Sequence, residues 1–157
     1  MPELPEVEVL ARHLAPSLQG KSIHQVRVHR TRVLRPTALR EFEKILTRAI
    51  FQDLERRGKF LLFQLRHHDT GKTIRLLGHL GMTGRMYLQG LGEPLPKHAA
   101  VSFSLLEQRF VFEDTRYFGR LTLDTAAIER LGLQASSVTV PPAGADDSRK
   151  GKTPCRP

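Results

Sequence analysis

Apolar side chains in the first third of the chain recur at two different spacings. In residues 5–18 they fall every three or four positions, with a proline at the start and a glycine at position 20. This spacing predicts an amphipathic helix, because proline suits the first helical turn and glycine suits the residue after the last. Residues 22–30 alternate apolar and polar side chains imperfectly and predict a strand. Residues 37–50 return to helical spacing and predict a second helix, with Thr37 as its N-cap.

Short apolar segments separated by turns occupy the middle of the chain. Asp69, Thr70 and Gly71 predict a turn between two of them, and the glycines and prolines of residues 90–98 predict a loop. A short helix is expected over residues 124–132. The two longer helices and the many short strands predict an α+β fold that is mainly β, a two-sheet β-sandwich flanked by helices. The expected strands span residues 50–56, 59–66, 72–78, 83–88, 100–106, 109–113 and 119–123.

The composition changes after Leu133. Residues 133–157 are rich in Ser, Pro, Gly and charged residues and show no apolar periodicity. Such a segment cannot bury enough apolar surface to order itself, so we expect a disordered tail. The ordered domain is therefore predicted to span residues 1–132.

The chain is strongly basic. Its 157 residues include 25 Lys and Arg residues against 16 Asp and Glu residues, a formal net charge of +9. The excess belongs to the body of the chain, because only four of the basic residues lie in residues 133–157. A basic body predicts a polyanionic partner, nucleic acid ahead of an acidic membrane surface. The alternative is a basic surface that is simply solvated.

Cysteine content and hydropathy exclude several other classes. Cys155 is the single cysteine, so one chain can form neither a disulfide framework nor a four-cysteine zinc site. No stretch reaches the roughly 18–20 apolar residues of a membrane span, and the acidic, proline-bearing start is unlike a signal peptide. We therefore expect a cytoplasmic protein that does not associate with membranes.

The first eight residues, MPELPEVE, can carry chemistry. If Met1 is removed, Pro2 presents a secondary amine, and an α-amino group has a pKa of roughly 7.7–8.0, so part of it is neutral and nucleophilic at neutral pH. Attack on an aldehyde-level carbon gives an iminium ion that is permanently cationic. Such an ion withdraws electrons without being protonated, which suits β-elimination beside a sugar C1′.

Two carboxylates lie close to that amine in the sequence. Glu3 is its neighbour and Glu6 follows one helical turn later, so either can move protons to and from a sugar oxygen or a leaving base. The alternative is structural, since both fit as acids that complement the helix dipole, and the prolines fit as a rigid lead-in. These eight residues by themselves favour the structural role, because short motifs are weak indicators.

Four ordered blocks change that balance. They are MPELPEVE at 1–8, RRGKFLLF at 56–63, GHLGMTGRM at 78–86 and EDTRYFGRL at 113–121. Together they resemble formamidopyrimidine-DNA glycosylases, bacterial enzymes that excise oxidised purines from DNA. The resemblance extends over roughly residues 1–132.

The resemblance implies a catalytic set. Pro2 matches the nucleophile of the family, Glu3 the general acid, and Lys59 a proton donor in elimination, while Glu6 supports the site or caps the helix. The implied reaction removes 8-oxoguanine and formamidopyrimidines, and then performs β/δ-elimination at the abasic site through a Schiff base on Pro2. Without the resemblance, Lys59 would be an ordinary exposed lysine at a strand edge.

The resemblance also implies a DNA-contacting set. An enzyme that extrudes a base from the duplex must fill the gap it leaves. The family fills it with a methionine, an arginine and a phenylalanine, which match Met82, Arg116 and Phe118. His79 and His98 match phosphate contacts. Each residue also has a structural alternative. In these alternatives Phe118 is a buried core residue, Arg116 neutralises a neighbouring aspartate, and the two histidines are ordinary surface or core residues.

The chain also departs from the family pattern. Thr115 stands where the family usually has proline, Tyr117 where it has arginine, and Ala99 and Ala100 follow the histidine where a polar or acidic pair is common. We expect these changes to alter loop geometry and the contacts with DNA, and to leave the catalytic groups in place.

Family members continue into a second domain, which contains a helix–two-turn–helix element and a cysteine zinc finger, whereas the likeness here ends near residue 132. We therefore expect a truncated, monomeric, nucleoid-associated protein that binds damaged double-stranded DNA and carries no zinc or other cofactor. The truncation is expected to impair its activity, so that release of oxidised guanine is weak or absent while some abasic-site cleavage remains. Two alternatives stay open. One is a DNA-binding fragment without catalysis, and the other is a basic sandwich whose partner is a protein or an RNA.

Overall fold

The computed structural model describes residues 4–123, and the expected helix at 124–132 and tail at 133–157 lie outside these residues. The first element is α1, Leu4–Leu18, which confirms the helix predicted over residues 5–18. Its apolar stripe is buried, as the helical spacing requires. In the part of the chain that is described, no helix is both long enough and apolar enough to cross a membrane.

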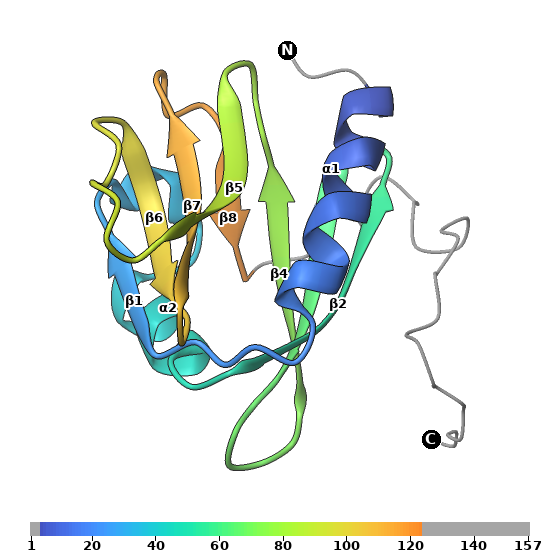
Figure 1. The fold of residues 1–157 in the computed structure, drawn as a ribbon, viewed down its shortest axis with the longest axis vertical. Coiled ribbons are helices and arrows are strands. Elements are labelled where there is room, and N and C mark those ends of the chain that lie inside the picture. The colour runs from blue at the N-terminus through green and yellow to red at the C-terminus, as the bar shows by residue number, and fades with distance from the viewer. Residues whose placement is uncertain (1–3, 124–157) are drawn as a thin grey trace.

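Two four-stranded antiparallel sheets form the body of the domain (Figure 1). One sheet has the strand order β2-β3-β4-β8 and the other has the order β1-β6-β7-β5. The predicted mainly β, two-sheet sandwich is therefore confirmed. The strands are β1 (Gln25–Val28), β2 (Ile50–Arg57), β3 (Phe60–Arg66), β4 (Thr73–His79), β5 (Gly84–Gly90), β6 (Ala99–Ser104), β7 (Gln108–Asp114) and β8 (Arg120–Thr122).

Two short helical segments lie between β1 and β2. The predicted second helix is shorter than its pattern, because α2 spans Leu39–Leu46. The helix ends there because Arg48 adopts a left-handed backbone conformation, with φ 72°, and donates its N–H to the carbonyl of Ile23. A 3₁₀ helix, η1, spans Thr31–Leu34, and the sequence pattern did not predict it.

The predicted capping role of Thr37 is wrong. Ala38 is the N-cap of α2, and it makes no side-chain capping hydrogen bond. Thr37 Oγ1 lies 2.7 Å from Oγ1 of Thr122 and accepts the N–H of Leu123 at 2.9 Å. The Thr37 hydroxyl therefore bonds to the end of β8 and not to the first turn of α2, where the local sequence had placed it.

Aromatic rings from both sheets fill the space between them. Phe51 and Phe63 come from one sheet, and Phe103 and Phe110 come from the other; all four are buried. The Phe110 ring centroid lies 6.1 Å from that of Phe51, 5.7 Å from that of Phe63 and 5.8 Å from that of Phe103. Contacts of this kind add to the energy of apolar burial, so Phe110 is a central contact between the two layers.

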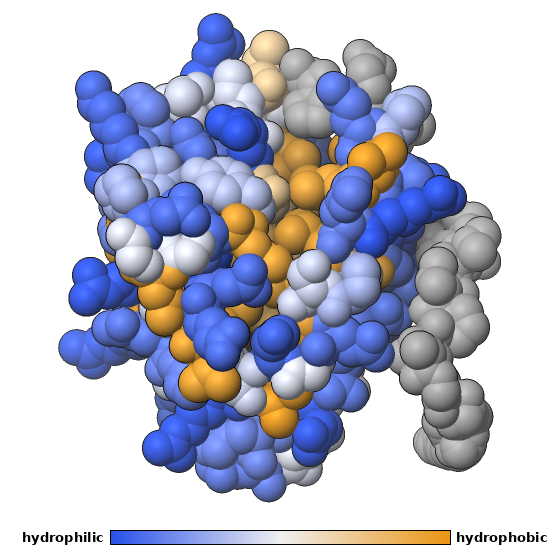
Figure 2. All heavy atoms as spheres, viewed as in Figure 1, coloured by the Kyte–Doolittle hydropathy of each residue, from blue (hydrophilic) through white to orange (hydrophobic). Residues whose placement is uncertain are grey.

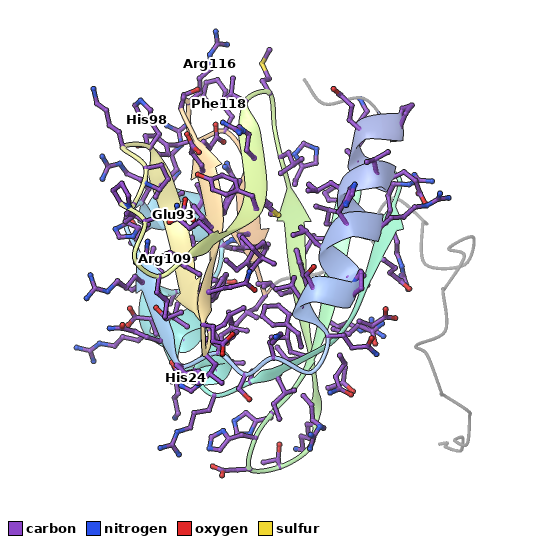
Figure 3. All side chains as sticks on the ribbon, in the orientation of Figure 1. His24, Glu93, His98, Arg109, Arg116 and Phe118 are labelled. Carbon is purple, nitrogen blue, oxygen red and sulfur yellow. The ribbon has the colours of Figure 1, made fainter. Side chains whose placement is uncertain are left out.

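The segment that follows β5 crosses the outer face of the β1-β6-β7-β5 sheet. Arg109 on β7 holds it there, with its guanidinium donating to the carbonyl oxygens of Glu93 and Leu91 (Figure 3). Gln89 adds a side-chain bond to the carbonyl of Pro94 at 3.4 Å. The loop predicted over residues 90–98 is thus a fixed part of the surface, and its last residues return to the end of the sandwich described next.

We expect Phe110→Ala to lower the free energy of unfolding by about 3–5 kcal/mol, because it removes a ring that touches three others and leaves a cavity. Urea unfolding of the purified chain measures this. Leu106→Ala is the control, since that side chain is 71% exposed and its loss should cost at most about 0.5 kcal/mol. Equal effects of the two substitutions would contradict the central place of Phe110.

Candidate nucleic-acid interface

Several connections and the start of α1 gather at one end of the sandwich (Figure 1). These are the β2–β3 turn at residues 58–59, the β4–β5 turn at residues 80–83, the end of the 90–98 loop, and the β7–β8 connection at residues 115–119, which we call the 115–119 loop. Figure 3 shows His98, Arg116 and Phe118 projecting together at this end.

A buried carboxylate joins these connections. Asp114 is fully buried. Its Oδ1 accepts the Thr83 hydroxyl at 2.5 Å and the backbone N–H of Arg116 at 3.1 Å, and its Oδ2 accepts the N–H of Gly119 at 2.8 Å. Its own N–H donates to the carbonyl of His98 at 3.0 Å. One residue therefore fixes the 115–119 loop, the β4–β5 turn and the end of the 90–98 loop relative to one another.

Two glycines let the β4–β5 turn and the 115–119 loop touch. Gly81 has φ 63°, and a Cβ there would lie 2.9 Å from the backbone nitrogen of Gly119. A Cβ on Gly119 would lie 2.7 Å from both the carbonyl of His79 and the ring of Phe112. No side chain fits between the two segments, so their tips stand together.

The residues at those tips are exposed. Met82 is 50% exposed and Phe118 is 47% exposed, so Phe118 is not the buried residue that the alternative interpretation expected. Arg116, two residues before Phe118, is also exposed. It donates its backbone N–H to Asp114, so its contact with that carboxylate is made by the backbone and not by the guanidinium. Two apolar tips and an arginine thus project from a base that the buried carboxylate holds rigid.

An ion pair ties the start of α1 to the β2–β3 turn. Arg56 Nε lies 2.6 Å from Glu8 Oε1, and another nitrogen of the same guanidinium donates to the carbonyl of Gly58 at 3.0 Å. The Arg56 guanidinium, followed by that of Arg12, lowers the pKa of the Glu8 carboxyl. The turn that contains Lys59 is therefore fixed relative to the helix that follows the first residues of the chain.

His79 lies between that turn and the β4–β5 turn. Its Nδ1 accepts the N–H of Gly81 at 3.0 Å, and its ring lies 5.1 Å from that of Phe60. Burial, followed by the charges of Lys59 and Arg120, lowers the pKa of His79. The ring is therefore neutral at pH 7, and because Nδ1 accepts a hydrogen bond, Nε2 has the proton and can donate it to a ligand.

A groove runs between α1 and the β4–β5 region, with a volume of about 610 Å³. Figure 2 shows apolar side chains gathered in this hollow. Glu6 and Met82 both line it, so a carboxylate near the start of α1 and an exposed apolar tip share one cleft. Its lining is Glu6, Leu10, Leu80, Met82, Thr83, Gly84, Arg85 and Met86.

Most residues singled out from the sequence lie at this end. Glu6, Lys59, His79, Met82, His98, Arg116 and Phe118 all belong to the segments just described, while Pro2 and Glu3 lie outside the described residues. The sequence did not single out Asp114, Thr83, Arg30 or Arg32. Arg30 and Arg32 lie over the rings of Tyr117 and Phe118, at 5.1 and 5.6 Å from the ring centroids. The run of basic residues between positions 21 and 40 was the sequence feature that could have identified these two arginines.

One group with metal-ligand chemistry lies elsewhere, in the β3–β4 turn. The side-chain ligand atoms of His67, His68 and Asp69 lie within 4.8 Å of one another. His67 Nδ1 already accepts the N–H groups of Asp69 and Thr70, and His68 Nε2 lies 3.0 Å from Asp69 Oδ1. These contacts account for the cluster as a hairpin turn, and a metal would have to displace them.

A two-sheet sandwich of this kind is the fold of the N-terminal domain of a class of DNA glycosylases. The chain belongs to the family described as the formamidopyrimidine-DNA glycosylase N-terminal domain, which matches residues 1–121.

Individual relatives agree with this assignment. The formamidopyrimidine-DNA glycosylase of Carboxydothermus hydrogenoformans is 35% identical over 128 residues, which is 82% of this chain and 47% of the relative. That of Moorella thermoacetica is 42% identical over 130 residues, 81% of this chain and 45% of the relative. The chain thus spans about half the length of the curated relatives it matches.

Solved structures show the same fold. The Lactococcus lactis Fpg in complex with DNA containing an abasic site superposes with a TM-score of 0.74 at 30% identity, covering 85% of this chain and 47% of that one. A complex of a Lactococcus lactis FPG mutant with DNA containing Fapy-dG gives a TM-score of 0.74 at 31% identity, with 85% and 47% covered.

We expect Asp114→Asn to destabilise the chain by about 1–3 kcal/mol, because an amide replaces one of two acceptor oxygens in a fully buried network. Hydrogen exchange of the Gly119 amide should accelerate more than that of amides in β3. Thr83→Val, which removes one donor and keeps the shape, should show a smaller effect of the same kind. Unchanged exchange at Gly119 in Asp114→Asn would show that the carboxylate does not hold the loop.

We expect NMR titration to give a midpoint for the His79 imidazole below the ordinary value of 6.5. Lys59→Gln should move that midpoint upward, because removing a nearby positive charge favours the protonated ring. The midpoint should stay below 6.5, since burial is the larger cause. Lys72→Gln is the control, because it also removes one positive charge but from the distant β3–β4 turn. It should leave the His79 midpoint unchanged. Equal shifts in the two variants would contradict the proximity of Lys59 and His79.

Proposed function

We propose that this chain acts in base-excision repair, as a bifunctional DNA glycosylase and abasic-site lyase on damaged double-stranded DNA. Its substrates would be oxidised purines, 8-oxoguanine and formamidopyrimidines, and the abasic sites that their removal creates. The observation that supports this most is the exposure of Met82 and Phe118 on two connections fixed by one buried carboxylate, beside a groove that reaches the start of α1.

The exposed tips would fill the gap in the duplex. Extruding a base costs stacking and pairing energy, and apolar side chains placed in the vacated space recover part of it. Met82 and Phe118 serve this purpose because they already project from a rigid base and need no ordering on binding. Arg116 would contact the base left without a partner. His98 and the proton on Nε2 of His79 would contact phosphates and set the register.

The groove beside Glu6 would receive the extruded nucleotide. Leu4 begins α1, and two residues span at most about 7 Å, so Pro2 and Glu3 can only act close to the first turn of that helix. Glu6 lies in that turn and lines the groove. The short distance along the chain from Pro2 to Glu6 supports a nucleophile at the second residue that would act on a sugar held in the groove.

The reaction begins at the N-terminus once Met1 is removed. The neutral Pro2 amine attacks C1′, the bond from C1′ to the base breaks, and Glu3 supplies the proton that the leaving base takes. The new C1′ ammonium then loses its proton, the bond from C1′ to the ring oxygen O4′ breaks, and O4′ takes up a proton, which leaves an iminium ion between Pro2 and C1′. The resulting iminium ion draws electrons from C2′, which loses a proton, and the bond from C3′ to the phosphate oxygen breaks. Lys59 donates a proton during this elimination, and Glu6 supports the site.

The remaining assignments follow from this function. Residues 1–132 would form the catalytic domain, followed by the tail at 133–157, and the chain would act as a monomer on DNA in the cytoplasm. A second candidate is a DNA-binding fragment without catalysis. The length of the curated relatives favours this candidate, because this chain matches only about half of it. The unmatched half of those relatives would contribute part of the lesion pocket and part of the phosphate contacts.

Borohydride trapping separates the two candidates. The chain is mixed with duplex DNA containing one abasic site, reduced, and the cross-link is mapped by mass spectrometry. We expect a cross-link on Pro2, because the iminium ion is reduced to a stable amine. A duplex with a tetrahydrofuran abasic analogue is the control, since it has no aldehyde and should give none. With Met1 confirmed absent, a lack of cross-linking to the true abasic site would leave only the DNA-binding candidate.

A further inference from the structure

Positive charge extends from the 115–119 loop onto η1. Residues 21–40 contain six Lys and Arg residues and no Asp or Glu. Arg30 and Arg32 are exposed in this stretch, and neither forms an ion pair with a residue between positions 4 and 123. A cationic surface without carboxylates attracts an anion from outside the chain.

The two arginines rest on the aromatic residues of the 115–119 loop. The Arg32 guanidinium carbon lies 5.6 Å from the ring centroid of Phe118, and that of Arg30 lies 5.1 Å from that of Tyr117. Both distances fall within the roughly 6 Å over which a cation is attracted to a ring face. Arg30 also donates to the carbonyl of His29 at 2.9 Å, so Arg32 has more of its guanidinium available.

The packing of η1 holds Arg32 against the Phe118 ring. Val33 and Leu34, which follow it in η1, are both 0% exposed. Thr37 then bonds to Thr122 in β8. Because β8 directly follows the 115–119 loop, η1 and Phe118 are fixed to the same strand.

We propose that Arg32 binds a DNA phosphate next to the base step that Phe118 enters, which adds a contact to the DNA interface under the proposed function. A duplex presents one negative charge per about 1.7 Å of its axis, so a cation lying against an inserted ring meets the backbone of the flanking nucleotides. The guanidinium suits this contact, because its planar fork donates two parallel hydrogen bonds to phosphate oxygens.

Arg32 also has a second role in this arrangement, since it rests on the ring that must be inserted. Before DNA binds, the guanidinium covers one face of Phe118 and limits its rotation. After binding, the same side chain holds the backbone on that side of the gap. The effect of Arg32 on affinity therefore depends on the presence of the Phe118 ring.

Salt-dependent DNA binding tests the proposal. Fluorescence anisotropy of a labelled duplex with one tetrahydrofuran abasic analogue is measured between 50 and 200 mM salt, about the range in which phosphate contacts are resolved. For Arg32→Gln we expect weaker binding and a log–log salt slope smaller by about 0.9, the value of one phosphate contact. Arg75→Gln is the matched control, an exposed arginine on β4 that lies toward the β3–β4 turn and away from the end of β4 that pairs with β8, and it should keep the wild-type slope.

Three outcomes would overturn the proposal. Equal slopes for Arg32→Gln and Arg75→Gln would remove Arg32 from the interface and leave the proposed function intact. Equal binding of an RNA duplex of the same length, with the same loss in Arg32→Gln, would show a general polyanion surface. In a Phe118→Ala background, an undiminished effect of Arg32→Gln would separate the arginine from the inserted ring. Wild-type chain without salt-dependent DNA binding would instead count against the proposed function.

Discussion

One buried carboxylate fixes the side of the candidate interface that bears the exposed tips. Asp114 receives a hydroxyl from the β4–β5 turn and two N–H groups from the 115–119 loop, and its own N–H holds the end of the 90–98 loop. A buried charged group is costly unless it is fully hydrogen-bonded. Because the donors to the carboxylate come from the β4–β5 turn and the 115–119 loop, neither segment can move without breaking a hydrogen bond to it, and the backbone of the same residue holds the 90–98 loop. The tips that project from them are therefore held before any ligand arrives.

A second constraint orders the opposite side of the groove. The Arg56 guanidinium bonds both Glu8 in α1 and the carbonyl of Gly58 beside Lys59. An ion pair this exposed contributes little to global stability, so its importance lies in geometry. The helix that follows the N-terminus and the turn with Lys59 are set together, facing the tips that Asp114 fixes. The proposed reaction would need an amine, a carboxylate and a lysine around one sugar, and such placement would favour it, since small displacements lower reactivity strongly.

The sequence predicted the helices and strands that follow from local apolar periodicity. It did not predict the hydrogen bonds whose partners lie far apart in the chain. The spacing of apolar residues was enough for α1, for the strands, and for the sandwich. Thr37 was assigned to a helix cap because that is its usual local use, but Thr122, far along the chain, takes its hydroxyl. The sequence did not single out Asp114, because its donors come from segments that only the fold brings together. Met82 and Phe118 were recognised through ordered motif blocks, and only the fold revealed that their side chains are exposed.

Tyr117 shows how the interface accommodates a residue that its backbone disfavours. Its φ of 57° lies in the left-handed region, which costs a residue with a side chain about 1–2 kcal/mol. The conformation persists because Asp114 bonds the N–H groups of Arg116 and Gly119 on either side of it. The ring is also held, with Arg30 over its face and the His98 ring at 6.3 Å. This backbone turn directs the next side chain outward, so the strain at Tyr117 and the exposure of Phe118 have the same origin. A glycine would remove the strain but also the ring under Arg30, and the loop would keep only the contact between Arg32 and Phe118 with the basic segment.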